Sequence, residues 1–268
     1  MSAARIDEAG DRSGPGLRGL VELVLFKTFA DLRAERERTY LGFVWWFVEP
    51  LLFMCVLVVL VEVIGLRGGP GFAQFLLAGL VFWQWYKSSI SHGMSSIMQA
   101  GGLLRNVRVA PAVFPLVTVF SDTIKFALVL VVLLAVLWAL GETPSASYAM
   151  LPVVLVSLLL LICGIALLLA AVVPFLPDLR FVIEPVLQAQ FFVSGIFYSF
   201  DRVPPEYQKW LVLNPMIVYI EAARDIVLEH RMPALGPLLA WSAIGILLLA
   251  TGIALTHMLA SRYSKLPA

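Results

Sequence analysis

The chain has 268 residues, of which 60% are hydrophobic and only 14% are charged, and its formal net charge is +1. Its mean hydropathy of +0.91 lies far from that of a soluble domain, and no basic run with interleaved aromatics indicates a nucleic-acid partner. Three uncharged runs each reach about the 20 residues that a helix needs to cross a bilayer, namely Gly68–Tyr86, Thr143–Pro177 and Met232–Ser261. We therefore expect an all-α integral membrane protein.

Residues 1–16 contain several Gly and Pro residues and predict a flexible tail. Their charged residues have no apolar core behind them, so we expect the first span, not a cleaved signal, to target the chain to the membrane. From residue 17 to residue 39, apolar side chains recur at three- and four-residue steps with Glu22, Lys27 and Asp31 between them. This pattern predicts an amphipathic helix that lies in the membrane surface.

Residues 40–268 contain six apolar segments, which predict a domain of six transmembrane helices. The segments run at about Gly42–Ile64, Phe72–Ile90, Ala112–Leu140, Tyr148–Val173, Phe181–Phe200 and Leu235–Ala260.

Two connecting segments are longer than turns. Ser91–Pro111 is polar and small at first and then Gly- and Arg-containing, which predicts a short helix within a loop. Asp201–Pro233 is the least regular region, and Asn214-Pro215 forces a break before its helix-like second half. We expect two short, half-buried helices here instead of a full span.

Lysine and arginine are unevenly distributed about the six predicted spans. If the N-terminus is cytoplasmic, thirteen of the nineteen basic residues lie on that side, five lie opposite, and Lys125 lies within a span. Because cytoplasmic loops carry the excess of Lys and Arg, both termini are predicted to be cytoplasmic.

Cysteine and histidine give no indication of a metal site. Cys55 and Cys163 fall inside predicted spans without the spacing of metal ligands, so we interpret them as packing residues. His92, His230 and His257 are scattered along the chain.

Four of the charged residues within predicted spans are candidates for a function, because a charge there is costly and is often functional. Asp122 and Lys125 are three residues apart, so they either form a relay or, the interpretation that we favour, neutralise one another. Glu49 and Glu184 each precede a proline and have no basic neighbour in sequence. They either contact the amphipathic helix or line polar cavities.

Several short motifs, spread over about residues 20–230, resemble the permease subunits of ABC-type polysaccharide exporters, which move O-antigen, capsular or teichoic acid chains. Their order and spacing carry the resemblance more than any one of them does. They are Asp31-Leu32-Arg33, Tyr40-Leu41-Gly42-Phe43-Val44-Trp45-Trp46, Glu49-Pro50, the loop Leu103–Pro115, Val203-Pro204, Leu213-Asn214-Pro215-Met216 and Glu221-Ala222-Ala223-Arg224-Asp225.

The resemblance implies a homodimeric pore in the bacterial inner membrane, with two copies of an ABC ATP-binding subunit beneath it and a lipid-linked polysaccharide as substrate. The chain contains no G-x-x-x-x-G-K-[ST] phosphate-binding loop, so we expect no enzymatic activity in it. ATP and Mg²⁺ would be bound by the partner subunit, and we expect this chain to hold no cofactor of its own.

The resemblance also implies two working parts outside the spans. The first is a coupling helix at about residues 103–110 that seats in the ATPase, formed around Leu104, Arg105, Asn106, Val107 and Arg108. Arg105 and Arg108 would meet either acidic groups of the ATPase, which we favour, or anionic lipid headgroups. The second is a pair of outward-facing gate helices at about residues 204–229, with Pro204, Tyr207, Trp210, Asn214, Pro215, Glu221 and Arg224.

A polysaccharide pore must bind sugars weakly at many places, and aromatic rings offer apolar faces to sugar C–H groups. The candidates for this conduit are Tyr40, Trp45, Trp46, Phe47, Trp83, Trp85, Tyr86, Phe191, Phe192, Phe197 and Tyr198. The alternative for each is a place in the belt of aromatic residues at the lipid headgroups.

Two other functions are compatible with a membrane protein of this size. An ABC permease could export a drug or a smaller lipid instead of a polysaccharide. A membrane-embedded glycosyl- or phospho-transferase would need an acidic cluster or a phosphate-binding loop at the headgroup level, and the sequence contains neither.

Overall fold

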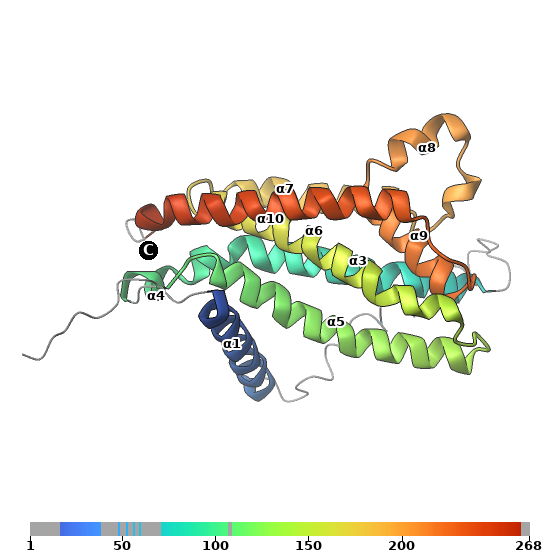
Figure 1. Ribbon diagram of the computed structural model, residues 1–268, viewed down its shortest axis with the longest axis horizontal. Coiled ribbons are helices and arrows are strands. Elements are labelled where there is room, and N and C mark those ends of the chain that lie inside the picture. Colours follow the sequence, from blue (N-terminus) through green and yellow to red (C-terminus); the bar gives the residue numbers. More distant parts are fainter. Residues whose placement is uncertain are drawn as a thin grey trace, which may run out of the picture.

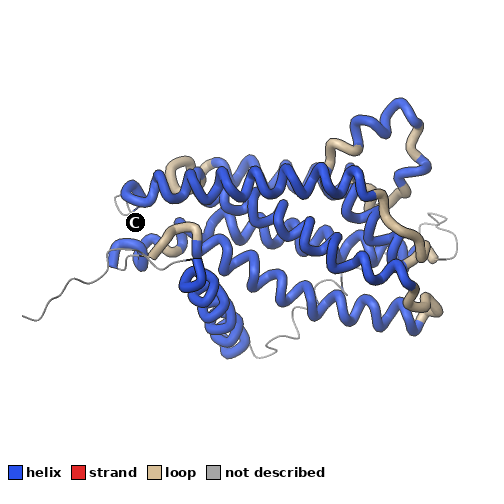
Figure 2. The backbone as a smooth tube through the Cα atoms, viewed as in Figure 1, coloured by secondary structure: helices blue, strands red, loops and turns tan. Residues whose placement is uncertain are grey.

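The computed structural model describes residues 17–38, 48, 52, 56, 59, 71–106 and 109–263 of the chain. Over these residues the fold is built from helices joined by turns, and Figure 2 shows no strand among them. In chain order they are α1 (Leu17–Arg38), α3 (Phe72–Gln99), α4 (Gly101–Asn106), α5 (Val113–Ala139), the 3₁₀ turn η2 (Ala146–Met150), α6 (Leu151–Val172), α7 (Leu179–Val193), the 3₁₀ turn η3 (Phe200–Arg202), α8 (Pro205–Leu211), α9 (Pro215–Val227) and α10 (Leu235–Tyr263).

Three helices are long and apolar enough to cross a membrane within the part of the chain that the structure describes: Val113–Ala139, Ala146–Val172 and Leu235–Tyr263. They lie along the long axis of the molecule, as does α3 (Figure 1). The fold is thus an all-helical membrane bundle, as the composition predicts. Most of the predicted first span, Gly42–Ile64, lies outside the described residues.

The predicted end of the second span at Ile90 is wrong, because α3 continues without interruption to Gln99. The polar stretch that suggested a loop is instead the last part of this helix, with Met94, Ser96 and Ile97 buried against its neighbours. The hydroxyl of Ser96 donates a hydrogen bond to the carbonyl of Gly93 at 2.7 Å, so a small polar residue is satisfied inside the bundle. The short helix of this segment is α4, which is described from Gly101 to Asn106, and the next two residues lie outside the described residues.

The predicted fifth span is too long, because α7 ends at Val193 and not at Phe200. The chain turns at Gly195, whose φ of 72° lies in the left-handed region that favours glycine. The hydroxyl of Ser194 also returns to the carbonyl of Gln190 at 2.6 Å and satisfies one carbonyl at the helix end. Fifteen residues remain in α7.

Helix α1 packs across the start of α5 at a steep angle to the bundle (Figure 1). Its buried line is Val24, Thr28 and Leu32, spaced by four residues, and Val24 contacts Val113 and Val117 of α5. Leu25, Phe26 and Phe29 are exposed beside this line. The apolar face that the sequence predicts is therefore divided between α5 and the surroundings of the protein.

Helices α6 and α10 make the closest helix pair of the bundle. A Cβ atom built on Gly245 of α10 would lie 2.8 Å from the backbone nitrogen of Leu161 in α6, so only glycine permits this approach. Lipid is as apolar as a protein interior, so helices in a membrane associate through such close van der Waals packing instead of through the hydrophobic effect.

The connecting elements gather at the two ends of the bundle. Helix α4 lies at the same end as the C-terminus of α10, whereas α8 and α9 lie toward the other end (Figure 1). Helix α8 projects sideways from the bundle. The two segments that the sequence singles out as more than turns are thus separated by the length of the bundle.

Candidate functional site

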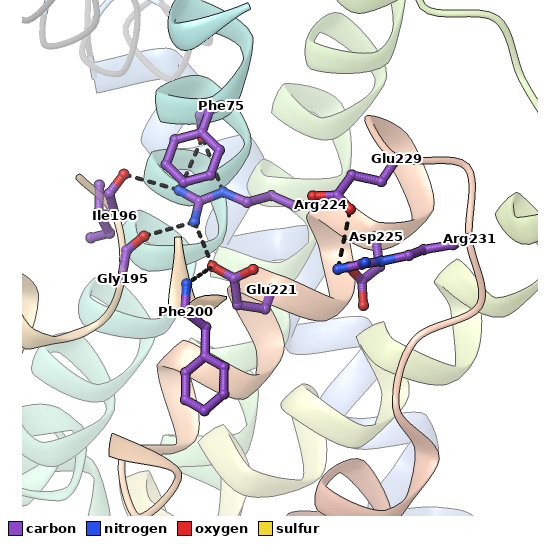
Figure 3. Close-up of polar contacts among 9 residues, drawn as sticks. All are labelled: Phe75, Gly195, Ile196, Phe200, Glu221, Arg224, Asp225, Glu229 and Arg231. Carbon is purple, nitrogen blue, oxygen red and sulfur yellow. Dashed lines mark hydrogen bonds and ion pairs between the residues drawn. The ribbon is translucent and has the colours of Figure 1, made fainter. Parts of the chain in front are cut away.

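Arg224 of α9 is 1% exposed and occupies the centre of the polar contacts at the α8–α9 end (Figure 3). Its guanidinium donates hydrogen bonds to three backbone carbonyls: to Phe75 of α3 at 3.0 Å, to Gly195 at 2.7 Å and to Ile196 at 2.9 Å. The guanidinium carbon also lies 3.3 Å from the centroid of the Phe75 ring. One side chain therefore joins α9 to α3 and to the turn that follows α7.

Glu221 lies one turn before Arg224 on α9 and completes this contact. Its Oε1 accepts hydrogen bonds from Arg224 Nη1 at 3.1 Å and from the backbone N–H of Phe200 at 3.3 Å. The buried cation thus has a carboxylate partner as well as carbonyls, which is the condition for keeping a charge away from water. Both residues belong to the motif that the sequence assigns to the outer gate.

Asn214 caps the N-terminus of α9, and Pro215 occupies the first helical position, where its missing N–H costs nothing. The Asn214 Oδ1 accepts the backbone N–H of Met216 at 3.1 Å and the side-chain amide of Gln190 at 2.9 Å. Its Nδ2 donates to the carbonyl of Val193 at 3.0 Å. At the helix break that the sequence predicts, Asn214 therefore also connects the start of α9 to the end of α7.

The loop after α9 is held by a second group of charges. Arg231 Nη2 lies 2.7 Å from Asp225 Oδ1 and 3.1 Å from Glu229 Oε2. The hydrogen bond to Asp225 raises the pKa of Arg231. His230 Nε2 lies 3.4 Å from Glu142 Oε2, which connects this loop to the end of α5.

Helix α8 has no buried residue and presents Tyr207 and Trp210, both exposed, from adjacent turns. Pro204 is exposed immediately before it. The helix is attached through Gln208, whose Nε2 donates to the carbonyl of Val203 at 2.8 Å. Among the predicted gate residues, Asn214, Pro215, Glu221 and Arg224 lie together on α9 and its N-cap, whereas Tyr207 and Trp210 are exposed on α8.

The predicted coupling helix coincides in part with α4. Leu104 is half-buried and packs against the ends of the neighbouring helices. Arg105 and Asn106 belong to α4 by their backbone, but their side chains are not described, and Val107 and Arg108 lie outside the described residues.

The predicted conduit aromatics occupy three kinds of place. Tyr40, Trp45, Trp46 and Phe47 lie outside the described residues. Four others are buried within the chain: Trp83, Trp85, Tyr86 and Phe191. Phe192 is exposed, and Phe197 and Tyr198 are half-buried.

The buried aromatics divide between two neighbours. Trp85 stacks on Phe126 of α5, with ring centroids 4.1 Å apart, and its indole N–H donates to Thr123 at 3.2 Å. Trp83 instead meets Phe191 of α7 at 5.6 Å.

Among the charges predicted within spans, Asp122 is 6% exposed and lies 3.6 Å from Lys125 Nζ. A second partner was not predicted: His92 Nδ1 of α3 lies 2.8 Å from Asp122 Oδ2. No sequence pattern connects His92 to Asp122, because they are 30 residues apart on different helices. Glu184 is half-buried on α7, and Glu49 lies outside the described residues.

A further polar contact inside the bundle was also not predicted. The hydroxyls of Ser157 on α6 and Tyr219 on α9 are 2.8 Å apart, and Ser157 also meets Ser242 of α10. Three helices therefore share one small hydroxyl cluster. In the part of the chain that the structure describes, no three His, Cys, Asp or Glu side chains gather as metal ligands would.

Long apolar helices, with short helices at both ends of the bundle and a buried arginine that holds one of them, define a multi-helix membrane protein. Residues 29–228 match the model of the ABC-2 type transporter family, so the chain belongs to that family. The match includes α4, α8 and α9 and ends at the C-cap of α9.

Individual relatives agree with this assignment. The chain is 31% identical to an O-antigen export system permease protein, RfbA, of Myxococcus xanthus over 82% of this chain and 85% of that protein. It is 25% identical to the protein of the same name in Klebsiella pneumoniae over 92% of this chain and 93% of that protein. It is 26% identical to the polysialic acid transport protein KpsM of Escherichia coli over 81% and 84% of the two chains.

Proposed function

We propose that this chain is the membrane-spanning subunit of an ATP-driven exporter that moves a lipid-linked polysaccharide across the bacterial cytoplasmic membrane. The similarity to permeases of O-antigen and polysialic acid export, over more than four fifths of the chain, supports this function most directly. A drug or a small lipid is the less favoured cargo, since the relatives described above are named for the export of O-antigen and the transport of polysialic acid.

The energy for export comes from a partner. The sequence contains no phosphate-binding loop, so ATP and Mg²⁺ are bound by a separate ABC subunit, of which two copies serve a homodimer of this chain. Helix α4 is the part that contacts this subunit, and its place at one end of the bundle supports the assignment.

The chain crosses the membrane six times with both termini in the cytoplasm. In this arrangement α4 and the end of α10 face the cytoplasm, while α8 and α9 face outward as gate helices. Arg224 differs from the other basic residues on the outward-facing side, because it is buried and donates hydrogen bonds to backbone carbonyls of the same chain. The excess of basic residues on the cytoplasmic side still supports this orientation.

The conduit for the glycan runs between the two copies. The exposed ring of Phe192 and the half-buried Tyr198 are the described aromatics best placed to line it. Trp83 and Trp85 support the bundle from inside the chain, since each packs on a neighbouring helix.

Reconstitution tests this function directly. The chain, purified with its ABC ATP-binding subunit, should form a complex with two copies of each, and ATP hydrolysis by the complex should rise on addition of lipid-linked glycan. Glycan should enter inverted vesicles only when ATP is present. Hydrolysis that responds to a hydrophobic drug but not to lipid-linked glycan would contradict the assigned cargo, and sugar transfer by this chain alone would contradict the transport function.

A further inference from the structure

At the α4 end of the bundle, the ends of four long helices meet in one buried apolar cluster. It contains Ile97 of α3, Phe114 of α5, Ala170 of α6 and Tyr263 of α10, each 5% exposed or less. Leu104 of α4 packs against this cluster. A displacement of α4 therefore acts on this cluster, where the ends of α3, α5, α6 and α10 meet.

Tyr263 makes the most specific contacts of the cluster. Its hydroxyl donates a hydrogen bond to the carbonyl of Ala171 at 3.1 Å. That carbonyl belongs to the last turn of α6, where helical carbonyls have no partner further along the helix. The Tyr263 ring also lies 5.3 Å from the ring of Phe175, just beyond α6. One side chain thus ties the end of α10 to the end of α6.

We propose that Tyr263 is a positioning residue that transmits the displacement of α4 to the α6–α10 pair. This inference depends on the proposed function, in which α4 contacts the ATPase. It assigns to the end of α10 a part in energy coupling.

The packing of α4 on one side and of the α6–α10 pair on the other supports this transmission through Tyr263. On the α4 side, no atom of the described residues lies within 4 Å of a Cβ built on Gly101 or Gly102. Leu104 packs against the cluster and so contributes to holding α4 on the bundle. On the other side, the close approach at Gly245 makes α6 and α10 move as one unit. A push on Tyr263 consequently shifts both helices together.

The test uses the complete complex of this chain with its ABC subunit in vesicles, and measures ATP hydrolysis and exported lipid-linked glycan in the same sample. Tyr263→Leu keeps an apolar side chain but removes the ring and the hydroxyl. We expect it to retain ATP hydrolysis while the glycan exported per ATP falls by about fivefold. Tyr263→Phe keeps the ring and should recover most of that ratio.

Met258→Ala is the matched control, because Met258 lies on the same helix and is 76% exposed. It should leave the ratio unchanged. Leu104→Ala tests the same route from the side of α4, because Leu104 packs against the cluster that contains Tyr263. Combined with Tyr263→Leu, it should lower the glycan exported per ATP no further than either change alone.

An unchanged ratio in Tyr263→Leu, or a parallel loss of hydrolysis and export, would overturn the inference while the wild-type complex still exports glycan. Independent, multiplying effects of Leu104→Ala and Tyr263→Leu would overturn it as well. If the wild-type complex shows no ATP-dependent export, the proposed function fails first, and the inference fails with it.

Discussion

Burial removes the Arg224 guanidinium from water, and its hydrogen-bond partners in the protein offset the free-energy cost. A buried guanidinium is tolerated only where its donors are satisfied, and here backbone carbonyls and Glu221 accept from it. Phe75, which accepts two of these bonds, is 149 residues away in the chain. The residue was predicted to belong to the outer gate. Its role as the fastening of α9 is a finding of the structure.

Replacing Arg224 by alanine should lower the free energy of unfolding by about 3–5 kcal/mol, because the buried carbonyls lose the guanidinium donors and the Glu221 carboxylate loses its cationic partner. Arg224→Lys should recover only part of this loss, since one ammonium cannot reproduce the planar fork. Unfolding by SDS in mixed micelles, followed by circular dichroism, measures the difference.

The control for this change is Arg231→Ala. Arg231 forms ion pairs too, but its side chain is 52% exposed, so its loss should cost less than about 1 kcal/mol. Equal destabilisation by the two substitutions would show that Arg224 does not fasten α9 as described.

Asp122 illustrates how a pair found in sequence becomes a group of three in space. The predicted contact with Lys125 is present, but the shorter contact is with His92 on another helix. Asp122→Ala should therefore destabilise the chain by about 1–3 kcal/mol, since His92 and Lys125 both lose the Asp122 carboxylate as a partner.

Adding Lys125→Ala to that variant should restore part of the loss, because it removes a half-buried ammonium that has lost the Asp122 carboxylate. Asp122→Asn distinguishes the two interpretations of the pair. A variant of normal stability that no longer exports glycan would favour a relay over simple neutralisation.

At the scale of the helices, the contact between α6 and α10 depends on the absence of a side chain. Gly245→Ala would place a methyl group 2.8 Å from the Leu161 nitrogen, and backbone cannot move aside as a flexible side chain can. We expect a loss of about 2 kcal/mol in unfolding free energy, typical of overpacking.

Gly236→Ala on the same helix is the matched control, because no atom lies within 4 Å of a Cβ built there. It should leave stability unchanged or raise it slightly, as alanine favours helix over glycine. Thermal unfolding of both variants in the same detergent compares them directly, and equal midpoints would count against the close α6–α10 contact.

The helix boundaries show where local patterns mislead. The serine-rich end of α3 was predicted to be a loop because it is polar, but the Ser96 hydroxyl bonds within the helix, and Gly93, Ser95 and Ser96 are buried in the bundle. The end of α7 was predicted too late because residues 194–200 remain apolar, although Gly195 turns the chain. A hydropathy pattern shows which residues are apolar enough for lipid or for a protein interior. It does not show where the backbone turns.

At the scale of the whole molecule, the separation of α4 from α8 predicts opposite exposure across the membrane. With Cys55 and Cys163 first replaced by serine, Ala110→Cys beyond α4 should react with a membrane-impermeant maleimide only from the cytoplasmic side. Lys209→Cys on α8 should react only from outside. Labelling of both positions in intact cells would contradict the six-span arrangement.

The sequence by itself determined that this is a membrane protein of helices, where most long helices lie, and which motifs resemble polysaccharide export. These features follow from composition and from periodicity, which are local. Only the tertiary structure decided that Arg224 bonds to α3, that His92 meets Asp122, and that Tyr263 caps the end of α6. Each of these contacts joins residues on different helices, so its existence depends on how the helices pack and not on any spacing along the chain.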